Sequence, residues 1–141
     1  MSSNPQRHPL KLLALGLCAL ALVACSKKEE APAPAAAAKA EPLKIAFAYV
    51  GPVGDGGWTF AHDNARKAIE KEFGDQVVTS FVESVPESAD AERVIRDFAS
   101  QGNKLIFGTT FGYMDPMLKV AADFKDVKFE HATGYKQADN M

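Results

Sequence analysis

The chain has 141 residues, which suits one domain of ordinary size rather than several. Its hydrophobic fraction of 47% and charged fraction of 24% are typical of a soluble globular protein. With 16 basic and 18 acidic side chains the formal net charge is -2, and this acidic balance excludes the basic surface of a nucleic-acid-binding protein.

The first 24 residues predict a secretory signal. Arg7 and Lys11 give a basic start to the apolar run 12-LLALGLCALALVA-24, which has the length of a signal peptide and is short for a membrane-spanning helix. The run ends in 22-LVAC-25, which resembles a bacterial lipobox, whose cysteine becomes the lipidated first residue after cleavage. We therefore predict lipidation at Cys25; the alternative is a plain secretory signal with an incidental cysteine.

Cleavage would remove two bases and no acids, leaving 14 bases against 18 acids and a net charge of -4. Cys18 would leave with the signal, so the folded part would have no cysteine for a disulfide or a thiol nucleophile. The next stretch, 26-SKKEEAPAPAAAAKAEP-42, has no large apolar side chain and predicts a disordered tether. The predicted organisation is a signal peptide over residues 1–24, the lipidated cysteine and tether over residues 25–42, and a ligand-binding lobe over residues 43–141.

From Leu43 onward the hydrophobic pattern alternates between strand-like and helix-like segments. The connections are short, which indicates an α/β domain with a mainly parallel sheet and helices on both faces. The predicted elements are, in chain order, a strand over residues 43–50, a helix over 59–73, a strand over 76–83, a helix over 88–101, a strand over 104–110, a helix that starts at Asp115 and Pro116, and a strand over 127–132.

Helical spacing of apolar side chains predicts which face of each helix is buried. In the third helix, Asp115 is predicted to cap the amino terminus, with Pro116 at the first helical position. The residues expected to face the core are Ala61, Ala65, Ala68, Ile69 and Phe73 in the first helix, Ala91, Val94, Ile95, Phe98 and Ala99 in the second, and Met117, Val120, Ala121 and Phe124 in the third.

A glycine-rich loop in 49-YVGPVGDGGWTFAHD-63 follows the first predicted strand. Loops of this kind often bind phosphate, but the dinucleotide fingerprint would need a glycine where Thr59 stands. The P-loop would need lysine followed by serine or threonine where Gly57 and Trp58 stand. Asp55 would also repel an anion, so both phosphate motifs are excluded.

An acid, an open backbone and an aromatic side chain together suit a ring with polar edges, such as a nucleobase or nucleoside. Asp55 can accept hydrogen bonds from hydroxyl or amino groups, Gly56 leaves the backbone open, and Trp58 offers a flat face for stacking. The alternative is that 54-GDGG-57 is only a tight turn and that Trp58 packs between helix and sheet.

A second loop of similar character, 108-GTTFGYMDP-116, follows the third predicted strand and carries Phe111, Tyr113 and Asp115. Phe111 stands on no regular core face. In open parallel sheets with flavodoxin-like strand order, the order reverses between the first and third strands, and ligands bind beyond the carboxyl ends of the strands at that point. The two loops are therefore predicted to flank one binding crevice.

Taken together, these segments resemble the basic membrane protein (Bmp) family, lipoproteins similar to purine-nucleoside receptors of ABC importers. The resemblance implies a type I periplasmic binding fold, in which two α/β lobes close on a ligand. The residues that carry it, besides the lipobox and tether, are 46-AFAYVGPVGDGGWTFAHDNARKAI-69, 89-ADAERVIRDFASQG-102, 106-IFGTTFGYMDP-116 and 127-VKFEHATGY-135.

The resemblance implies a lipid-anchored, extracytoplasmic protein that binds a purine nucleoside or base and presents it to an ABC permease, without enzyme activity, cofactor or metal. Many members carry Phe-Asn where Trp58 and Thr59 stand, so nucleoside and free base both remain open. The family's second lobe does not follow residue 141, and we expect a truncated gene or a fragment. The residues predicted to bind the ligand are Asp55, Gly56, Trp58, Thr110, Phe111, Tyr113 and Asp115.

Other functions fit the sequence less well. For an enzyme, His62 and His131 stand in no nucleophile or zinc pattern, and His62 is expected to face solvent. A receiver-like signalling domain shares the alternation of elements, but the signal peptide would place it on the wrong side of the membrane. A sensory or structural lipoprotein, or a non-functional truncated receptor, remains open.

Overall fold

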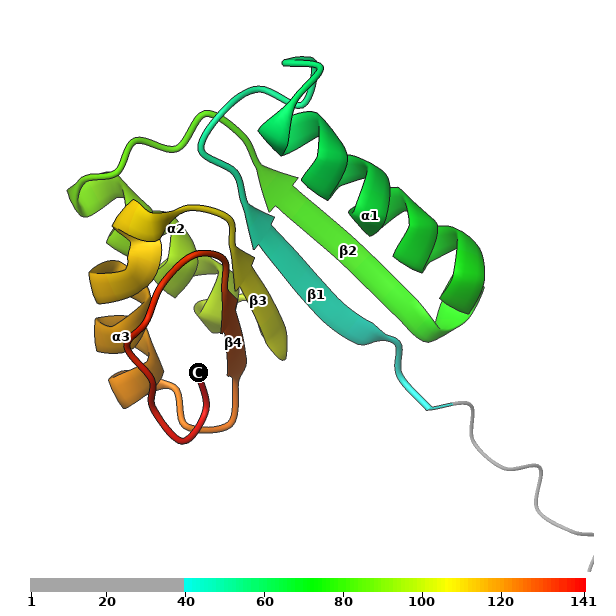
Figure 1. The fold of residues 1–141 in the computed structure, drawn as a ribbon. Coiled ribbons are helices and arrows are strands. Elements are labelled where there is room, and N and C mark those ends of the chain that lie inside the picture. Colours follow the sequence, from blue (N-terminus) through cyan, green and yellow to red (C-terminus); the bar gives the residue numbers. More distant parts are fainter. Residues whose placement is uncertain (1–39) are drawn as a thin grey trace, which may run out of the picture. The chain divides into compact units, whose positions relative to one another are not determined.

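A computed structural model describes residues 40–141; the predicted signal segment, Cys25 and most of the predicted tether lie outside the described residues. Four strands form one sheet in the order β2-β1-β3-β4, and all neighbouring strands are parallel (Figure 1). The predicted α/β fold with a parallel sheet is confirmed. The helices and strands are β1 (Leu43–Ala48), α1 (Trp58–Phe73), β2 (Val77–Val82), α2 (Ala89–Ser100), β3 (Leu105–Gly108), α3 (Met114–Asp123) and β4 (Lys128–His131), with 3-10 turns at Gly74–Gln76 and Phe111–Tyr113.

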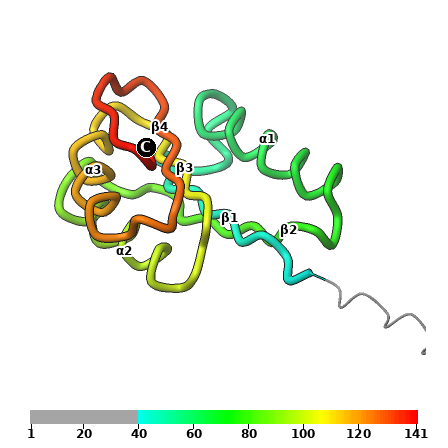
Figure 2. The backbone as a smooth tube through the Cα atoms, turned by 90° about the horizontal axis from the view of Figure 1, so that it is seen from below, coloured from blue at the N-terminus to red at the C-terminus, as the bar shows by residue number. Residues whose placement is uncertain are grey.

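Helices cover both faces of the sheet, α1 on one face and α2 with α3 on the other (Figures 1 and 2). Right-handed crossovers explain this, because the chain runs from β1 to β2 in one direction and then back past β1 to β3 and β4. Alternate side chains of β1 divide accordingly. Ala46 and Ala48 join the core under α2 and α3, while Ile45 and Phe47 pack on the side of α1.

The larger core lies between the sheet and the pair α2 and α3. All five α2 residues predicted to face the core are buried. Ser88 precedes the helix, and its Oγ accepts a hydrogen bond from the backbone N–H of Asp90 (3.3 Å), which is an N-cap contact. In α3 the predicted inner residues are buried too, except Phe124, which is half-buried against the same core.

The buried face of α1 is polar, so the face predicted for this helix is wrong. Asp63 and Arg66 are buried, whereas the three alanines and Phe73 are exposed; of the predicted inner residues only Ile69 packs against the core. Arg66 donates from Nε to Asp63 Oδ1 (2.8 Å), and from Nη1 to Glu70 Oε1 (3.1 Å) and to Thr79 Oγ1 on β2 (2.9 Å). Buried charges are tolerated when they are paired and hydrogen-bonded. Apolar periodicity alone cannot reveal such a face.

Asp115 does not cap α3, contrary to the prediction. The 3-10 turn runs directly into the helix, which begins at Met114, so Asp115 already lies inside the first turn and makes no cap contact. Its carboxylate instead accepts a hydrogen bond from Lys136 Nζ (2.6 Å), in the segment after β4. This contact raises the pKa of Lys136.

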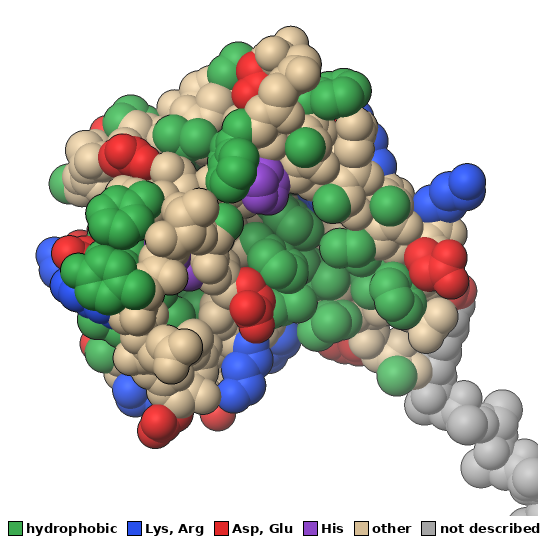
Figure 3. All heavy atoms as spheres, viewed as in Figure 1, with side chains coloured by type: hydrophobic (Ala, Val, Ile, Leu, Met, Phe, Trp, Pro, Cys, Tyr) green, Lys and Arg blue, Asp and Glu red, His purple; other side chains and the backbone are tan. Residues whose placement is uncertain are grey.

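The face of the sheet that carries α1 is only partly covered. Figure 3 shows hydrophobic side chains gathered in a hollow beside α1, and the rings of Phe47 and Phe107 stack there with centroids 4.8 Å apart. A groove of about 430 Å³ lies on this face of the sheet and is lined by Leu43, Ile45, Ile69, Phe73, Gln76, Val77, Leu105 and Phe107.

No helix within residues 40–141 has both the length and the apolar character needed to span a bilayer.

Candidate functional site

The two predicted ligand loops start side by side at the carboxyl ends of β1 and β3. Ala48 and Gly108, the last residues of these strands, are register partners. The next residue, Thr109, donates to the Ala48 carbonyl oxygen from both its backbone N–H (3.2 Å) and its Oγ1 (3.0 Å). Because β1 lies between β2 and β3, the strand order reverses here, as predicted for a binding crevice.

Asp55 anchors the start of α1. Its Oδ1 accepts from the backbone N–H groups of Gly57 (2.8 Å) and Phe60 (2.9 Å), and its Oδ2 accepts from the N–H of Thr59 (3.0 Å). These bonds, that from Gly57 first, lower the pKa of Asp55. A carboxylate has about four acceptor positions, and the Thr59 hydroxyl also bonds to this one, so Asp55 is satisfied by the residues that begin α1. Gly56 adopts φ +66°, a conformation that favours glycine.

Trp58 joins the two loops. It is the first residue of α1, and its indole Nε1 donates to the carbonyl oxygen of Thr109 (2.6 Å). The side chain nevertheless remains 47% exposed, with the His62 ring tilted against it at 4.7 Å. His62 is half-buried rather than solvent-facing, and its Nδ1 lies 2.7 Å from the Trp58 carbonyl oxygen. The hydrogen bond therefore fixes the polar edge of the Trp58 indole, while about half of the residue remains accessible to solvent.

Of the aromatic residues predicted to bind the ligand, Phe111 is exposed like Trp58, at 53%. Another aromatic side chain, Tyr135, lies 6.2 Å away between ring centroids, at a tilt of 39°, and is 72% exposed. Tyr135 comes from the segment after β4, and the neighbouring Lys136–Asp115 pair holds this segment against α3. The sequence prediction missed Tyr135, although an aromatic residue in a loop after a strand was the signal that had singled out Phe111.

Tyr113 and Thr110 support the second loop from within. Tyr113 is fully buried, and its hydroxyl donates to the carbonyl oxygen of Val85 (2.6 Å). Burial, and secondarily the charge of Glu87, raises its pKa. Thr110 Oγ1 donates to Glu87 Oε1 (2.5 Å). Both residues hold the loop in place; Tyr113 is buried, whereas Thr110 is only half-buried and keeps part of its surface exposed.

A hollow of about 300 Å³ opens beside the site, where β3 and β4 end next to α1. Burial lowers the pKa of His131 on its wall. The described residues contain no group of three or more side chains suited to hold a metal ion. The lining residues are His62, Phe107, Gly108, Thr109, Glu130, His131 and Ala132.

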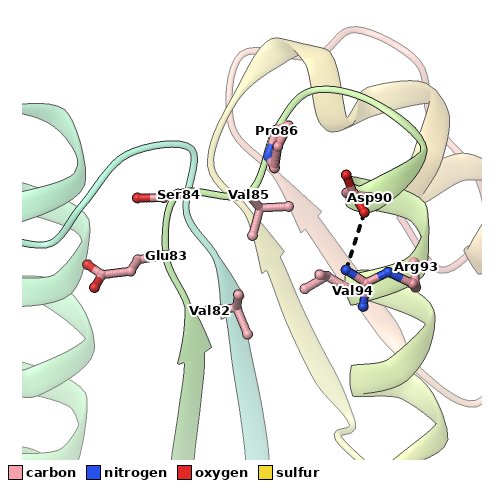
Figure 4. A pocket seen from close by; sticks show the side chains of 8 residues that line it. All are labelled: Val82, Glu83, Ser84, Val85, Pro86, Asp90, Arg93 and Val94. Carbon is pink, nitrogen blue, oxygen red and sulfur yellow. Dashed lines mark hydrogen bonds and ion pairs between the residues drawn. The ribbon is translucent and has the colours of Figure 1, made fainter.

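A smaller hollow of about 240 Å³ lies between the end of β2 and α2 (Figure 4). None of the predicted ligand residues lines it. Its polar side is formed partly by Arg93 and Asp90, which pair at 3.3 Å on the surface of α2. The candidate site is therefore the edge that carries Trp58, Phe111 and Tyr135, not this hollow.

Comparison with known proteins identifies a family model and several relatives that match the described lobe. Residues 43–141 match the family described as "ABC transporter substrate-binding protein PnrA-like" (Bmp). A purine-binding protein of Brucella abortus (strain 2308) is 63% identical over 101 residues, which are 72% of this chain and 29% of that protein. A protein of Haloferax volcanii, named as a candidate ABC transporter glucose-binding protein, is 46% identical over 101 residues, which are 72% of this chain and 25% of that protein.

Solved structures agree on the fold. A solute-binding protein of an ABC transporter from Conexibacter woesei superposes with a TM-score of 0.56 and 27% identity, over 62% of this chain and 28% of that one. A solute-binding protein from Aeropyrum pernix superposes with a TM-score of 0.58 and 24% identity, over 70% of this chain and 27% of that one. The chain thus spans between a quarter and a third of the length of these relatives.

Proposed function

Since the chain belongs to the PnrA-like (Bmp) family of ABC transporter substrate-binding proteins, we propose that it captures a purine nucleoside or a purine base for an ABC importer. The family consists of binding proteins rather than enzymes. The observation that carries the proposal is the pair of half-exposed aromatic side chains, Trp58 and Phe111, on two loops that a single hydrogen bond ties together.

Aromatic stacking supplies the main attraction in this proposal. A base stacked on an aromatic side chain gains about 1–3 kcal/mol, as measured by truncation. Trp58 is fixed through its indole N–H, so its face is already oriented before the ligand arrives. Phe111 and Tyr135 provide further aromatic surface beside the second loop. Asp55 holds the backbone around Trp58 in place, and this is its contribution to ligand binding.

The state of the acids favours a flat ring over a sugar. A sugar presents many hydroxyl groups and depends on free polar side chains, but three acids that lie in or contact the two loops already have partners. Asp55 accepts three backbone N–H groups, Asp115 is paired with Lys136, and Glu87 holds the Phe111 loop. The relatives include both a purine-binding protein and a candidate glucose-binding protein, and the purine-binding protein has the higher identity.

The rest of the proposal concerns the setting. The protein acts outside the cytoplasm, tethered through a lipid on Cys25, and delivers its ligand to a membrane permease. Ligand binding shifts the receptor towards a closed form that the permease recognises, as a ligand shifts any equilibrium towards the state it binds better. Capture and release involve no covalent chemistry.

The test is a titration of the purified chain with adenosine, guanosine, adenine, glucose and leucine. Trp58 is the only tryptophan in the sequence, so its emission reports directly on the site. We expect a saturable change in emission with at least one purine and none with leucine. A response to glucose alone, or no response from a chain whose circular dichroism shows it to be folded, would overturn the assignment.

A further inference from the structure

The connection between β2 and α2, residues 83–88, touches both ligand loops although it belongs to neither. On one side, Glu83 Oε2 accepts from the backbone N–H of Val53 (2.6 Å), and the N–H of Ser84 donates to the Gly51 carbonyl oxygen (3.1 Å). Both partners lie in the glycine loop. Figure 4 shows Glu83 and Ser84 projecting towards α1, whereas Val85 projects to the opposite side.

On the other side, Glu87 reaches the Phe111 loop. Its Oε1 accepts from Thr110 Oγ1 (2.5 Å) and from the backbone N–H of Gly112 (3.2 Å), the two residues that flank Phe111. Position 112 has no room for a larger residue, because an added Cβ would overlap the Glu87 side chain along its length. The carboxylate and the glycine thus fit each other closely.

Glu87 is exposed to solvent, where a glutamate would ordinarily stay hydrated and free to move. Here one of its oxygens instead accepts two hydrogen bonds, one from the residue before Phe111 and one from the residue after it. A second link runs deeper, since the Tyr113 hydroxyl donates to the Val85 carbonyl oxygen and the Val85 N–H donates to the Tyr49 carbonyl oxygen.

We infer that Glu87 is a positioning residue for ligand binding: it fixes Phe111 relative to Trp58, and Glu83 performs the matching task for the glycine loop. This inference rests on the proposed function, because it concerns the same exposed aromatic side chains. The segment 83–88 then sets the spacing of the two loops before any ligand arrives. Such preorganisation raises affinity by lowering the entropy lost on binding.

The experiment compares Glu87→Ala with Glu87→Gln, which keeps a carbonyl oxygen that can accept both hydrogen bonds. Glu72→Ala is the control, an exposed glutamate near the far end of α1. We expect Glu87→Ala to weaken binding of the purine identified above by about tenfold, with a nearly unchanged melting temperature, and Glu87→Gln to restore most of the affinity.

Two readouts need no ligand. Trp58 donates to the carbonyl oxygen of Thr109, next to Thr110, so release of the loop should change Trp58 emission in Glu87→Ala. Hydrogen exchange at the Gly112 amide should also accelerate in this variant and return towards the parent rate in Glu87→Gln. These arms separate the inference from the proposed function, because they remain informative if no purine binds.

Several outcomes would overturn the inference. One is parent-like Trp58 emission and Gly112 exchange in Glu87→Ala. Another is a Glu87→Gln variant as impaired as the alanine variant, because the acceptor contacts would then not be the cause. A third is an equal loss of affinity in Glu72→Ala. Gly112→Ala provides an independent check. The added methyl group would push the Glu87 side chain away from the loop, so this variant should reproduce the Glu87→Ala pattern.

Discussion

Truncation of Phe111 tests the proposed stacking site most directly. Phe111 is 53% exposed as a residue in the described structure, so about half of its surface is available to a ligand and half packs on its surroundings. Stacking of one base contributes about 1–3 kcal/mol, and each 1.4 kcal/mol corresponds to a tenfold change in the dissociation constant. We therefore expect Phe111→Ala to raise the dissociation constant for the bound purine by about 5- to 150-fold. Because an exposed side chain contributes little to folding, the free energy of unfolding should change by less than about 1 kcal/mol.

The assay is the titration of Trp58 emission, because the reporter is retained in this variant. Phe73→Ala is the matched control: this phenylalanine is 47% exposed and ends α1, far along the helix from Trp58. Phe111→Leu, which keeps apolar area but loses the aromatic face, should fall nearer to alanine than to the parent. Parent-like purine affinity in Phe111→Ala, or an equal loss in Phe73→Ala, would refute stacking on Phe111.

Three further predictions concern Trp58 and the stability of the lobe around it. Trp58→Phe, which removes the indole N–H that Thr109 accepts, should weaken purine binding, as followed by calorimetry since the fluorescent reporter is lost. Asp63→Asn should lower the free energy of unfolding, measured in urea, by about 3 kcal/mol, because it breaks the buried ion pair with Arg66. Lys67→Ala removes a partner of Asp63 whose side chain is 59% exposed, and it should lower the free energy of unfolding by less than about 1 kcal/mol. Burial lowers the pKa of His131, so the unfolded chain takes up its proton first as pH falls. The stability that this residue supports is complete above about pH 6.5 and is lost progressively below it, and His131→Asn should flatten that part of the urea midpoint–pH curve.

The alternation of elements was predictable, as was the core beneath α2. The apolar side chains of α2 recur with the spacing of a helix, and this spacing predicts the buried face where no charged residue is buried. The meeting of the two ligand loops also followed from sequence, because strand order in parallel sheets obeys the handedness of crossovers. Both predictions depend on hydrophobic spacing or on chain topology, and neither requires individual side-chain contacts to be known.

The buried face of α1 was not predictable in this way. Asp63 and Arg66 read as a solvated pair on a helix, and only contact with Thr79, on the strand beside it, makes their burial favourable. The same holds for the site: Asp55 looked like a free acceptor and is mostly satisfied by the helix that follows it. Glu87 carried no signal at all, since its partners lie more than 20 residues further along the chain.

The central place of β1 in the sheet has a consequence for how the chain can fold. Its two neighbours, β2 and β3, come about 34 and about 60 residues later in the chain. At a synthesis rate of about 5–20 residues per second, β1 would wait roughly 3–12 s before its second partner exists. Until then its apolar residues and at least one unpaired edge are exposed, and such edges are templates for aggregation. The strand from which the binding loop starts is therefore also the segment with the greatest need of protection before the fold is complete.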